Sequence, residues 1–224
     1  MSNYIEVMTI VEGKTEEIFI NSLLRPYLSD KNIFMYATQI SKPGQKGGDV
    51  RFERAKKDIE LHLKQRHDTY ITTLVDYYGT REWPGLDEVP PQAEPAQIAK
   101  IVNGATKREV VALFSAYRAE HRFIPYMAIH EFEALLFSSS PVIAAELGVQ
   151  ESEVDFVLQE CGEPEAINNS PQTAPSKRLN GWTNGGKFPK TTIGIAMAKA
   201  IGICVMRKKC PLFNTWLETL ENIQ

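Results

Sequence analysis

The chain has 224 residues, of which 43% are hydrophobic and 24% are charged, which is the make-up of a globular protein with one substantial core. It contains no apolar run of about 18 residues or more, and its N-terminus lacks the basic-then-apolar order of a signal peptide, so we expect a cytoplasmic protein with no membrane contact. The formal net charge of −3 also argues against a protein that binds nucleic acid through overall positive charge.

Strands and helices are predicted to alternate from the start of the chain. Residues 4–11 (YIEVMTIV) form a short apolar run typical of a buried strand, and the run ends in Glu12-Gly13. Thr15 is a suitable N-cap for the helix that follows, which we expect to end before Pro26. The next predicted elements are a strand at residues 33–40, a glycine-rich basic loop at 42–48, a helix at 49–66 and a strand at 70–75.

The alternation continues after a surface excursion. Residues 81–95 are rich in proline and acid, which indicates an irregular segment. The elements expected after it are helices at residues 96–102 and 107–120, a strand at 123–129 and a helical stretch at 130–137. Strands separated by helices predict an α/β fold with a mostly parallel sheet, covered on both faces and connected by right-handed crossovers. Ligands of such sheets bind where the strands end.

The pattern loosens after residue 140, which predicts an α/β core at residues 1–140 and a mainly helical C-terminal extension at 141–224 packed on it. The elements expected in the extension are helices at 141–147 and 151–160, a loop at 168–186, and helices at 192–203 and 211–223. Between Ala166 and Leu217 there are eight Lys or Arg residues and no Asp or Glu, so the remainder of the chain carries −11. A basic surface from this segment would then contact phosphates, and an acidic surface from the remainder would hold metal ions. The alternative is that the charges are separated along the chain by chance.

Acidic residues follow three of the predicted strands. Glu12 follows the first, Asp76 the third, and Glu131 and Glu133 the fourth, so these residues share one edge of a parallel sheet. Glu16, one helical turn after Glu12, can point back to the same edge. Crowded carboxylates repel one another unless a cation neutralises them, and all-oxygen ligands suit Mg²⁺ or Mn²⁺. The pattern predicts a metal site for phosphoryl chemistry.

Each of these residues also has a structural interpretation. Glu16 is equally explained as an acid that complements a helix dipole. Only one of Glu131 and Glu133 is expected to face the site, and Glu131 is favoured because it is closer to the strand end. His130 would donate to phosphate or carry a proton, although a lone histidine more often has a structural hydrogen bond. Gly13-Lys14-Thr15 is similar to the end of a P-loop, but Met8 stands where that motif needs glycine, which argues against an ATPase.

Five motifs together resemble a known family. VEGKTE at residues 11–16 is similar to the opening motif of Toprim domains, and most similar to that of the OLD-type nucleases. The set resembles the small bacterial proteins grouped as domain of unknown function 4276, and it spans nearly the whole chain. Its further members are DYYGT at 76–80, HEFEALLF at 130–137, PSKR at 175–178, and CPLF at 210–213 followed by Trp216.

The resemblance implies a Toprim-like fold and assigns roles to particular residues. Glu12 would be the first-strand acid, a metal ligand or general acid/base, and Asp76 would open the second metal-binding motif. That motif is normally Asp-x-Asp, and this sequence departs from it because Tyr78 occupies the second acidic position. One ligand is then missing unless Glu131 or Glu133 replaces it. OLD-type nucleases also place a later lysine near the scissile phosphate, and Lys177 of PSKR is the residue that matches it here.

These observations lead to a metal-dependent nuclease as the first hypothesis for function. Mg²⁺ or Mn²⁺ would be bound by Glu12, Glu16, Asp76 and Glu131 or Glu133, with Lys177 stabilising the phosphate. Arg178, Lys187 and Lys190 would hold the backbone of DNA or RNA, the partner. By analogy with related Toprim nucleases, the protein would act with a separate ATPase in bacterial anti-phage defence, and a homo-oligomer is left open.

Two further hypotheses share the fold. One is a regulatory or nucleic-acid-binding subunit that has lost turnover, which Tyr78 would explain. The other is nucleotidyl transfer of the primase type with the same acids. The length of 224 residues argues against topoisomerase activity, because it leaves no room for the additional domains that hold and gate a duplex.

Overall fold

A parallel β-sheet forms the centre of the protein, whose computed structural model describes residues 4–41, 50–167, 170 and 172–223. The strands are β1 (Ile5–Val11), β2 (Ile33–Gln39), β3 (Thr69–Asp76), β4 (Phe123–Ile124) and β5 (Met127–Ala128). Their order is β2-β1-β3-β4, β5 also pairs with β3, and every pairing is parallel. The predicted α/β class with a parallel sheet is therefore confirmed. The predicted basic loop at residues 42–48 lies outside the described residues.

The fourth predicted strand is interrupted at Pro125 and forms β4 and β5 as two short pieces. Proline has no N–H to give to the ladder, so continuous pairing with β3 is lost at this point. The side chain of Thr73 fills the gap, because its Oγ1 donates to Tyr126 O at 2.9 Å and accepts from Tyr126 N at 3.0 Å. The strand end that leads to Glu131 and Glu133 is thus held in register by a threonine.

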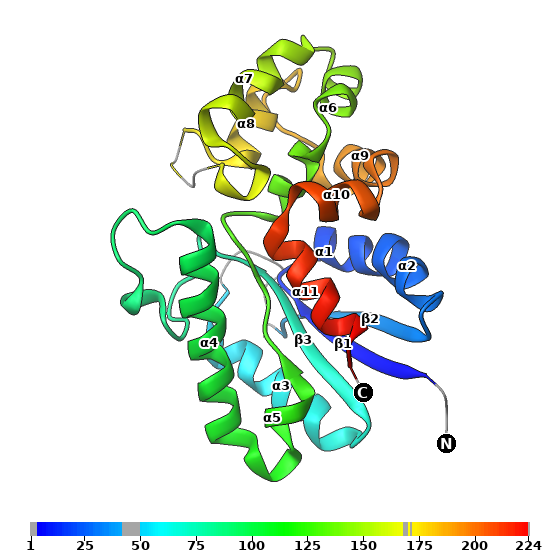
Figure 1. Cartoon of the computed structure of the whole chain (residues 1–224), viewed down its shortest axis with the longest axis vertical. Helices are drawn as coiled ribbons and strands as arrows, with labels where there is room; N and C mark the ends of the chain where they lie inside the picture. The colour runs from blue at the N-terminus through cyan, green and yellow to red at the C-terminus, as the bar shows by residue number, and fades with distance from the viewer. Residues whose placement is uncertain (1–3, 42–49, 168–169, 171, 224) are drawn as a thin grey trace.

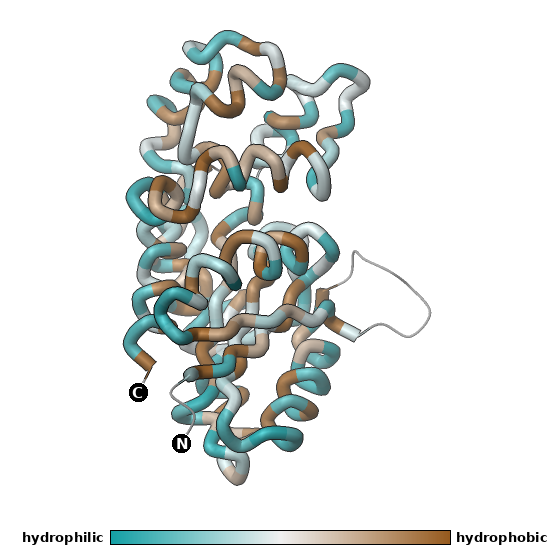
Figure 2. Tube along the Cα trace, turned by 90° about the vertical axis from the view of Figure 1, so that its right-hand side faces the viewer, coloured by the Kyte–Doolittle hydropathy of each residue, from teal (hydrophilic) through white to brown (hydrophobic). Residues whose placement is uncertain are grey.

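Helices cover both faces of the sheet (Figure 1). On one face lie α1 (Lys14–Phe19), the π-helical turn η1 (Ile20–Leu24), α2 (Arg25–Ser29) and α11 (Pro211–Glu221). On the other lie α3 (Phe52–Gln65) and α4 (Pro95–Phe114). Alternate residues of β1 point to opposite sides, so that Val11 belongs to the first core and Ile10 to the second. In Figure 2 hydrophobic and hydrophilic residues alternate along most helices, as expected where one side of a helix is buried.

The helix after β1 continues through Pro26, where the sequence predicted its end. The turn before the proline is π-helical, and Arg25 N–H bonds to Ile20 O, five residues back. A proline ring clashes with the carbonyl four residues back in a regular α-helix, and the wider turn accommodates it. Leu23, Leu24 and Leu28 are buried around this segment, so packing holds the helix together across the proline.

The helices predicted at 96–102 and 107–120 are one continuous helix, α4, followed by a short turn η3 (Ser115–Tyr117) and α5 (Ala119–Arg122). Gly104 costs a helix only about 1 kcal/mol, which burial of Val102, Val110 and Phe114 offsets. The excursion before α4 is irregular as predicted, apart from the single turn η2 (Leu86–Glu88). It packs tightly on α4, since a Cβ on Gly85 would lie 2.7 Å from the Cβ of Ala105.

The C-terminal helices lie beyond the carboxyl ends of the strands (Figure 1). They are η4 (Phe132–Ser138), α6 (Ser140–Leu147), α7 (Glu151–Cys161), η5 (Pro164–Ala166), α8 (Pro175–Trp182), η6 (Lys190–Gly194), α9 (Ile195–Ile201) and α10 (Ile203–Lys209). The prediction of a loop at residues 168–186 was wrong where α8 forms, and α10 was not predicted. Gly202, at φ 79°, ends α9 and allows the chain to turn into α10.

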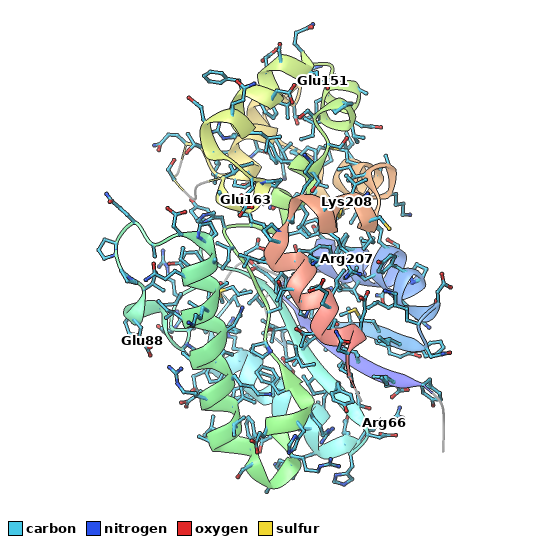
Figure 3. The ribbon with its side chains drawn as sticks, viewed as in Figure 1. Arg66, Glu88, Glu151, Glu163, Arg207 and Lys208 are labelled. Atoms are coloured by element: carbon cyan, nitrogen blue, oxygen red, sulfur yellow. The ribbon has the colours of Figure 1, made fainter. Side chains whose placement is uncertain are left out.

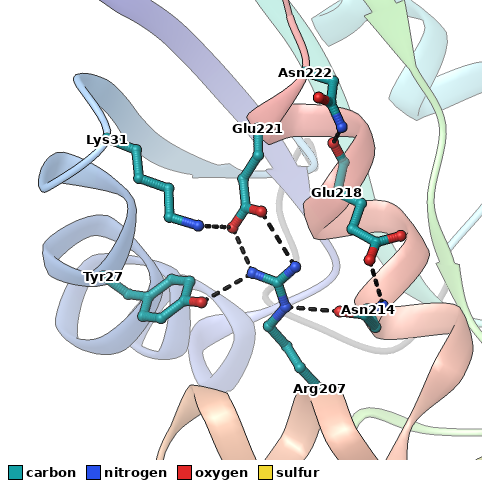
Figure 4. Close-up of polar contacts among 7 residues, drawn as sticks. All are labelled: Tyr27, Lys31, Arg207, Asn214, Glu218, Glu221 and Asn222. Atoms are coloured by element: carbon teal, nitrogen blue, oxygen red, sulfur yellow. Dashed lines mark hydrogen bonds and ion pairs between the residues drawn. The ribbon is translucent and has the colours of Figure 1, made fainter.

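Polar contacts of Arg207 join the C-terminal helices to the helices over the sheet (Figure 4). Arg207 on α10 donates to Tyr27 Oη of α2 at 2.9 Å and to Asn214 Oδ1 of α11 at 2.7 Å. Its guanidinium also pairs with both oxygens of Glu221, which Lys31 contacts at 2.6 Å. In Figure 3 Arg207 lies near the middle of the long axis of the molecule. Among the described residues, no helix has both the length and the apolar character to cross a membrane.

Candidate functional site

The carboxyl edge of the sheet brings together acids from three separate elements. Glu12 directly follows β1, Asp76 ends β3, and Glu133 lies in η4 just after β5. Asp76 N–H points toward Glu12 Oε2 at 3.5 Å, and Asp76 Oδ1 accepts from Phe132 N–H at 2.8 Å. Burial raises the pKa of Asp76 well above its usual value, and Glu12, Glu16 and Glu133 raise it further. We call Glu12, Glu16, Asp76 and Glu133 the acid cluster.

Glu16 combines the two roles that the sequence left open. Its Oε2 accepts from Gly13 N–H at 3.0 Å, which caps the start of α1. Its side chain is also buried, with 7% of the residue exposed. Burial raises the pKa of Glu16 to about 7, and the charges of Glu133 and Glu12 add to the increase. The capping hydrogen bond therefore fixes Glu16 in a position where it also repels its acidic neighbours.

Glu133 is the most buried acid of the cluster, and Lys190 is its counterion. Only 1% of Glu133 is exposed, and Lys190 Nζ, from η6, lies 2.6 Å from its Oε1. Oε2 has no hydrogen-bond partner among the described residues. Burial raises the pKa of Glu133 while Lys190 lowers it, and the acids in turn raise the pKa of Lys190 although its burial acts the other way. An ammonium group thus supplies the positive charge that the cluster needs.

Glu131 has a different set of contacts from Glu133. Its Oε2 accepts from Ser176 N–H and its Oε1 from Ser176 Oγ, both at 2.7 Å. Ser176 lies in the first turn of α8, so Glu131 satisfies a free N–H at the positive end of that helix. The structure therefore commits both Glu131 oxygens to anchoring α8, and Glu133 is the residue that couples to Asp76. A metal-binding role for Glu131 stays a prediction.

The basic residues singled out in the sequence lie in three different environments. Lys177 and Lys187 are exposed, on α8 and in the segment after it. Arg178 is half-buried, and its Nε donates to Thr173 O at 2.9 Å. Lys190, predicted only as one of several residues that hold a nucleic-acid backbone, is the one that reaches the acid cluster. No local motif marks Lys190, because only the folding of η6 onto η4 brings it there.

His130 lies at the same edge in an unusual backbone conformation. Its φ is 65°, in the left-handed region, and this reversal directs the chain from β5 into η4. The ring is buried, with 7% of the residue exposed, and Nδ1 has no hydrogen-bond partner among the described residues. Burial lowers the pKa of His130 to about 4, so the imidazole is neutral at pH 7. Its nearest ring is that of Tyr77, 6.2 Å away between centroids.

The ligand type of the acid cluster fits a hard divalent cation, and its present geometry is not that of a closed metal site. All its donors are carboxylate oxygens, which Mg²⁺ and Mn²⁺ prefer, and Glu133 Oε2 is buried and unpaired. Within the described part of the chain, no three His, Cys, Asp or Glu side chains stand in a metal-binding arrangement. The ammonium group of Lys190 supplies positive charge to the acid cluster.

The raised pKa of Glu16 predicts a pH dependence of stability in metal-free protein. The contribution of Glu16 is fully present below about pH 4.5 and is lost as the pH rises through about 7. Glu16→Gln keeps an acceptor for Gly13 N–H and removes the charge, so the variant is expected to be more stable than wild type near pH 8 by up to about 3 kcal/mol. Melting temperatures at about pH 5 and pH 8 measure the difference, which should reach roughly 6–12 °C at the higher pH. An equal pH dependence of the two proteins would contradict the burial of this charge.

Known proteins give two matches to the chain. A model of the family described as "Domain of unknown function (DUF4276)" matches residues 11–221, which include the whole acid cluster. Among solved structures, the C-terminal region of the OLD protein of Xanthomonas campestris pv. campestris is similar with a TM-score of 0.43 and 16% sequence identity, over 99% of this chain and 96% of that one. No curated protein matches the chain at a significant level.

Proposed function

The chain belongs to the family described as Domain of unknown function (DUF4276), and because that description assigns no activity, we propose from the site itself that it is a metal-dependent nuclease. The observation that carries the proposal is the acid cluster, which gathers four carboxylates beside the half-exposed Lys190 and in which burial and neighbouring acids raise the pKa of Glu16, Asp76 and Glu133. Perturbed acids gathered at the carboxyl edge of a parallel sheet are typical of a functional site. If the acid cluster had only a structural role, the repulsion among its carboxylates would lower stability without any gain in function.

Glu12, Glu16, Asp76 and Glu133 would hold Mg²⁺ or Mn²⁺, which when bound stabilises the attacking and leaving oxygens of a phosphodiester. The other groups of the chain prepare the site. Gly13 N–H and Phe132 N–H hold Glu16 and Asp76 in place through hydrogen bonds of 3.0 and 2.8 Å. Lys190, whose charge is maintained by its acidic neighbours, would donate to a phosphate oxygen. This is the role that the resemblance to OLD-type nucleases assigned to Lys177.

The resemblance of VEGKTE to the opening motif of Toprim domains supports the same chemistry. Tyr78 stands in the second acidic position of the Asp-x-Asp motif, and its backbone N–H bonds to His130 O at 2.7 Å. Glu133 from the neighbouring η4 would supply the missing carboxylate. Lys177 and Lys187 are exposed near the same end of the molecule and would hold the nucleic-acid backbone with Arg178. A partner ATPase and a role in anti-phage defence remain part of this proposal by analogy.

A binding or regulatory subunit without turnover is the second candidate, and the Lys190–Glu133 ion pair favours it. A lysine that permanently neutralises the acids would make a metal unnecessary. The two candidates differ in their response to metal. A nuclease should gain thermal stability from Mn²⁺, because a cation that binds only the folded state shifts the folding equilibrium.

Cleavage assays test the proposal directly. Wild type and Glu12→Gln, purified in parallel, are incubated with plasmid, single-stranded DNA and total tRNA in Mg²⁺, in Mn²⁺ and in EDTA. We expect wild type to cut at least one of these substrates only when a divalent cation is present, and Glu12→Gln to be inactive. Equal cleavage by both proteins would point to a contaminant. If wild type neither cuts any substrate nor melts at a higher temperature in Mn²⁺, the binding-subunit candidate replaces the nuclease.

A further inference from the structure

A hollow of about 610 Å³ adjoins the acid cluster on the other side of the carboxyl edge of β3. Tyr77 and His130 are among its lining residues, and they are next in sequence to Asp76 and Glu131. Successive residues of a strand point to opposite faces, so Tyr77 packs toward the α4 side while Asp76 faces the cluster. The rest of the wall comes mainly from the proline-rich excursion and the end of α7, with Ile98 of α4 and Ala166 of η5. A volume of this size is typical of a site for a small organic group.

The chemistry of the wall favours a flat, uncharged group over a phosphate. Pro90, Pro91 and Pro95 lie with the ring of Tyr77 around the hollow, and flat apolar faces of this kind accept aromatic rings by stacking. Glu94 and Glu160 are the charged residues of the wall, and no lysine or arginine is among its described lining residues. A phosphate would therefore be repelled here. It would be attracted instead to the lysines on the other side of the edge.

His130, one of the residues that line the hollow, has a polar atom without a partner. Nδ1 of His130 is buried without a hydrogen bond among the described residues, and a buried polar atom left in this state costs about 1–3 kcal/mol. A ligand with a donor or acceptor in the plane of its ring would satisfy this atom while stacking on Tyr77. Nucleobases have that combination, since their edges carry hydrogen-bonding groups and their faces stack.

We propose that this hollow, bounded by Tyr77, His130 and the prolines of residues 90–95, binds one unpaired nucleobase of the nucleic-acid strand whose phosphate lies at the acid cluster. The inference rests on the proposed function, because it requires the scissile phosphate to lie at the acid cluster. The base of the same nucleic-acid strand would then lie on the opposite side of the end of β3. The inference names the substrate class as single-stranded or locally unpaired nucleic acid. It also gives the proline-rich excursion a function, since that segment forms the outer wall.

Abasic scanning of a short single-stranded DNA tests the inference. Binding is measured in Ca²⁺ for oligonucleotides that each lack the base at one position, with wild type, Tyr77→Leu and the matched control Tyr77→Phe. For wild type and Tyr77→Phe, loss of the base at one position is expected to weaken binding about 5- to 150-fold more than at its neighbours. For Tyr77→Leu this difference should disappear. Melting curves establish that the variants are folded.

The outcomes separate this inference from the proposed function. A flat profile for wild type would overturn the base site. Cleavage together with a flat profile would leave the nuclease in place and remove only the base site. A base-dependent position without cleavage in Mn²⁺ would support the base site and contradict the nuclease. Absence of any binding would overturn the base site, whatever the fate of the nuclease.

Discussion

Asp76→Asn is expected to lower the proposed metal-dependent cleavage by more than about a hundred-fold, and to raise the melting temperature of the metal-free protein. Changes to residues that only orient metal ligands already cost about 10- to 100-fold, so a direct ligand should cost more. Stability should rise because Asp76 is held among Glu12, Glu16 and Glu133, which together with burial raise its pKa well above its usual value. Asparagine keeps Oδ1 as acceptor for Phe132 N–H.

The measurements are initial rates in Mn²⁺ and melting temperatures in EDTA near pH 8. Asp58→Asn is a matched control, because Asp58 is also buried but accepts from both Ser41 N–H and Ser41 Oγ, at 2.8 and 2.6 Å. Its neutralisation should lower stability and leave the cleavage rate unchanged. A loss of stability in Asp76→Asn, like that of the control, would show that the charge of Asp76 is satisfied in the fold and that the cluster is structural.

Trp216→Ala is expected to lower the free energy of unfolding by about 3–5 kcal/mol, which is the cost of removing a large buried aromatic side chain. Trp216 is 3% exposed, and its ring stacks on that of Tyr126 with centroids 4.4 Å apart and planes at 5°. Its Nε1–H donates to Thr72 Oγ1 at 2.9 Å. The residue therefore attaches α11 to the centre of the sheet through both packing and a buried hydrogen bond.

Thermal and urea unfolding measure this effect, and the melting temperature should fall by roughly 6–20 °C. Trp216→Phe keeps the stacking and loses the hydrogen bond, so it should cost about 1–3 kcal/mol, less than alanine. Phe156→Ala serves as the control, because Phe156 is 57% exposed and its removal should change stability by no more than about 0.5 kcal/mol. If Trp216→Ala were no worse than this control, α11 would contribute little to the cover of the sheet.

The parallel sheet built from alternating strands and helices, and the position of Glu12 and Asp76 at the strand ends, could be predicted from the sequence, because both follow from local patterns. Short apolar runs bounded by turns mark buried strands, and an acid directly after such a run lies at the carboxyl edge of a parallel sheet whatever the details of packing. The helix through Pro26 could not be predicted. The π-helical turn that accommodates the proline is stabilised by tertiary packing, which overrides local preference.

The different roles of Glu131, Glu133 and Lys190 could not be predicted from the sequence either. The sequence favoured Glu131 over Glu133 as the site residue because it is closer to the strand end. In the structure Glu131 bonds to Ser176, 45 positions later, while Glu133 lies beside Lys190. The same contact lies at the first turn of α8, a helix within the segment that was predicted as a loop. Lys190 was grouped with other basic residues, because its ion pair with Glu133 arises only when η6 folds over η4.

The cover that α11 gives to the sheet has a consequence for the order in which the chain acquires its structure. Thr72 and Trp216 are 144 positions apart, so β3 is synthesised long before the side chain that shields it. Until that segment leaves the ribosome, Tyr126 and the neighbouring apolar surface face water, and closing so long a loop is a slow step. Fragments that stop before Trp216 are therefore expected to aggregate or to be degraded, and the complete sheet should appear only at the end of synthesis of this region.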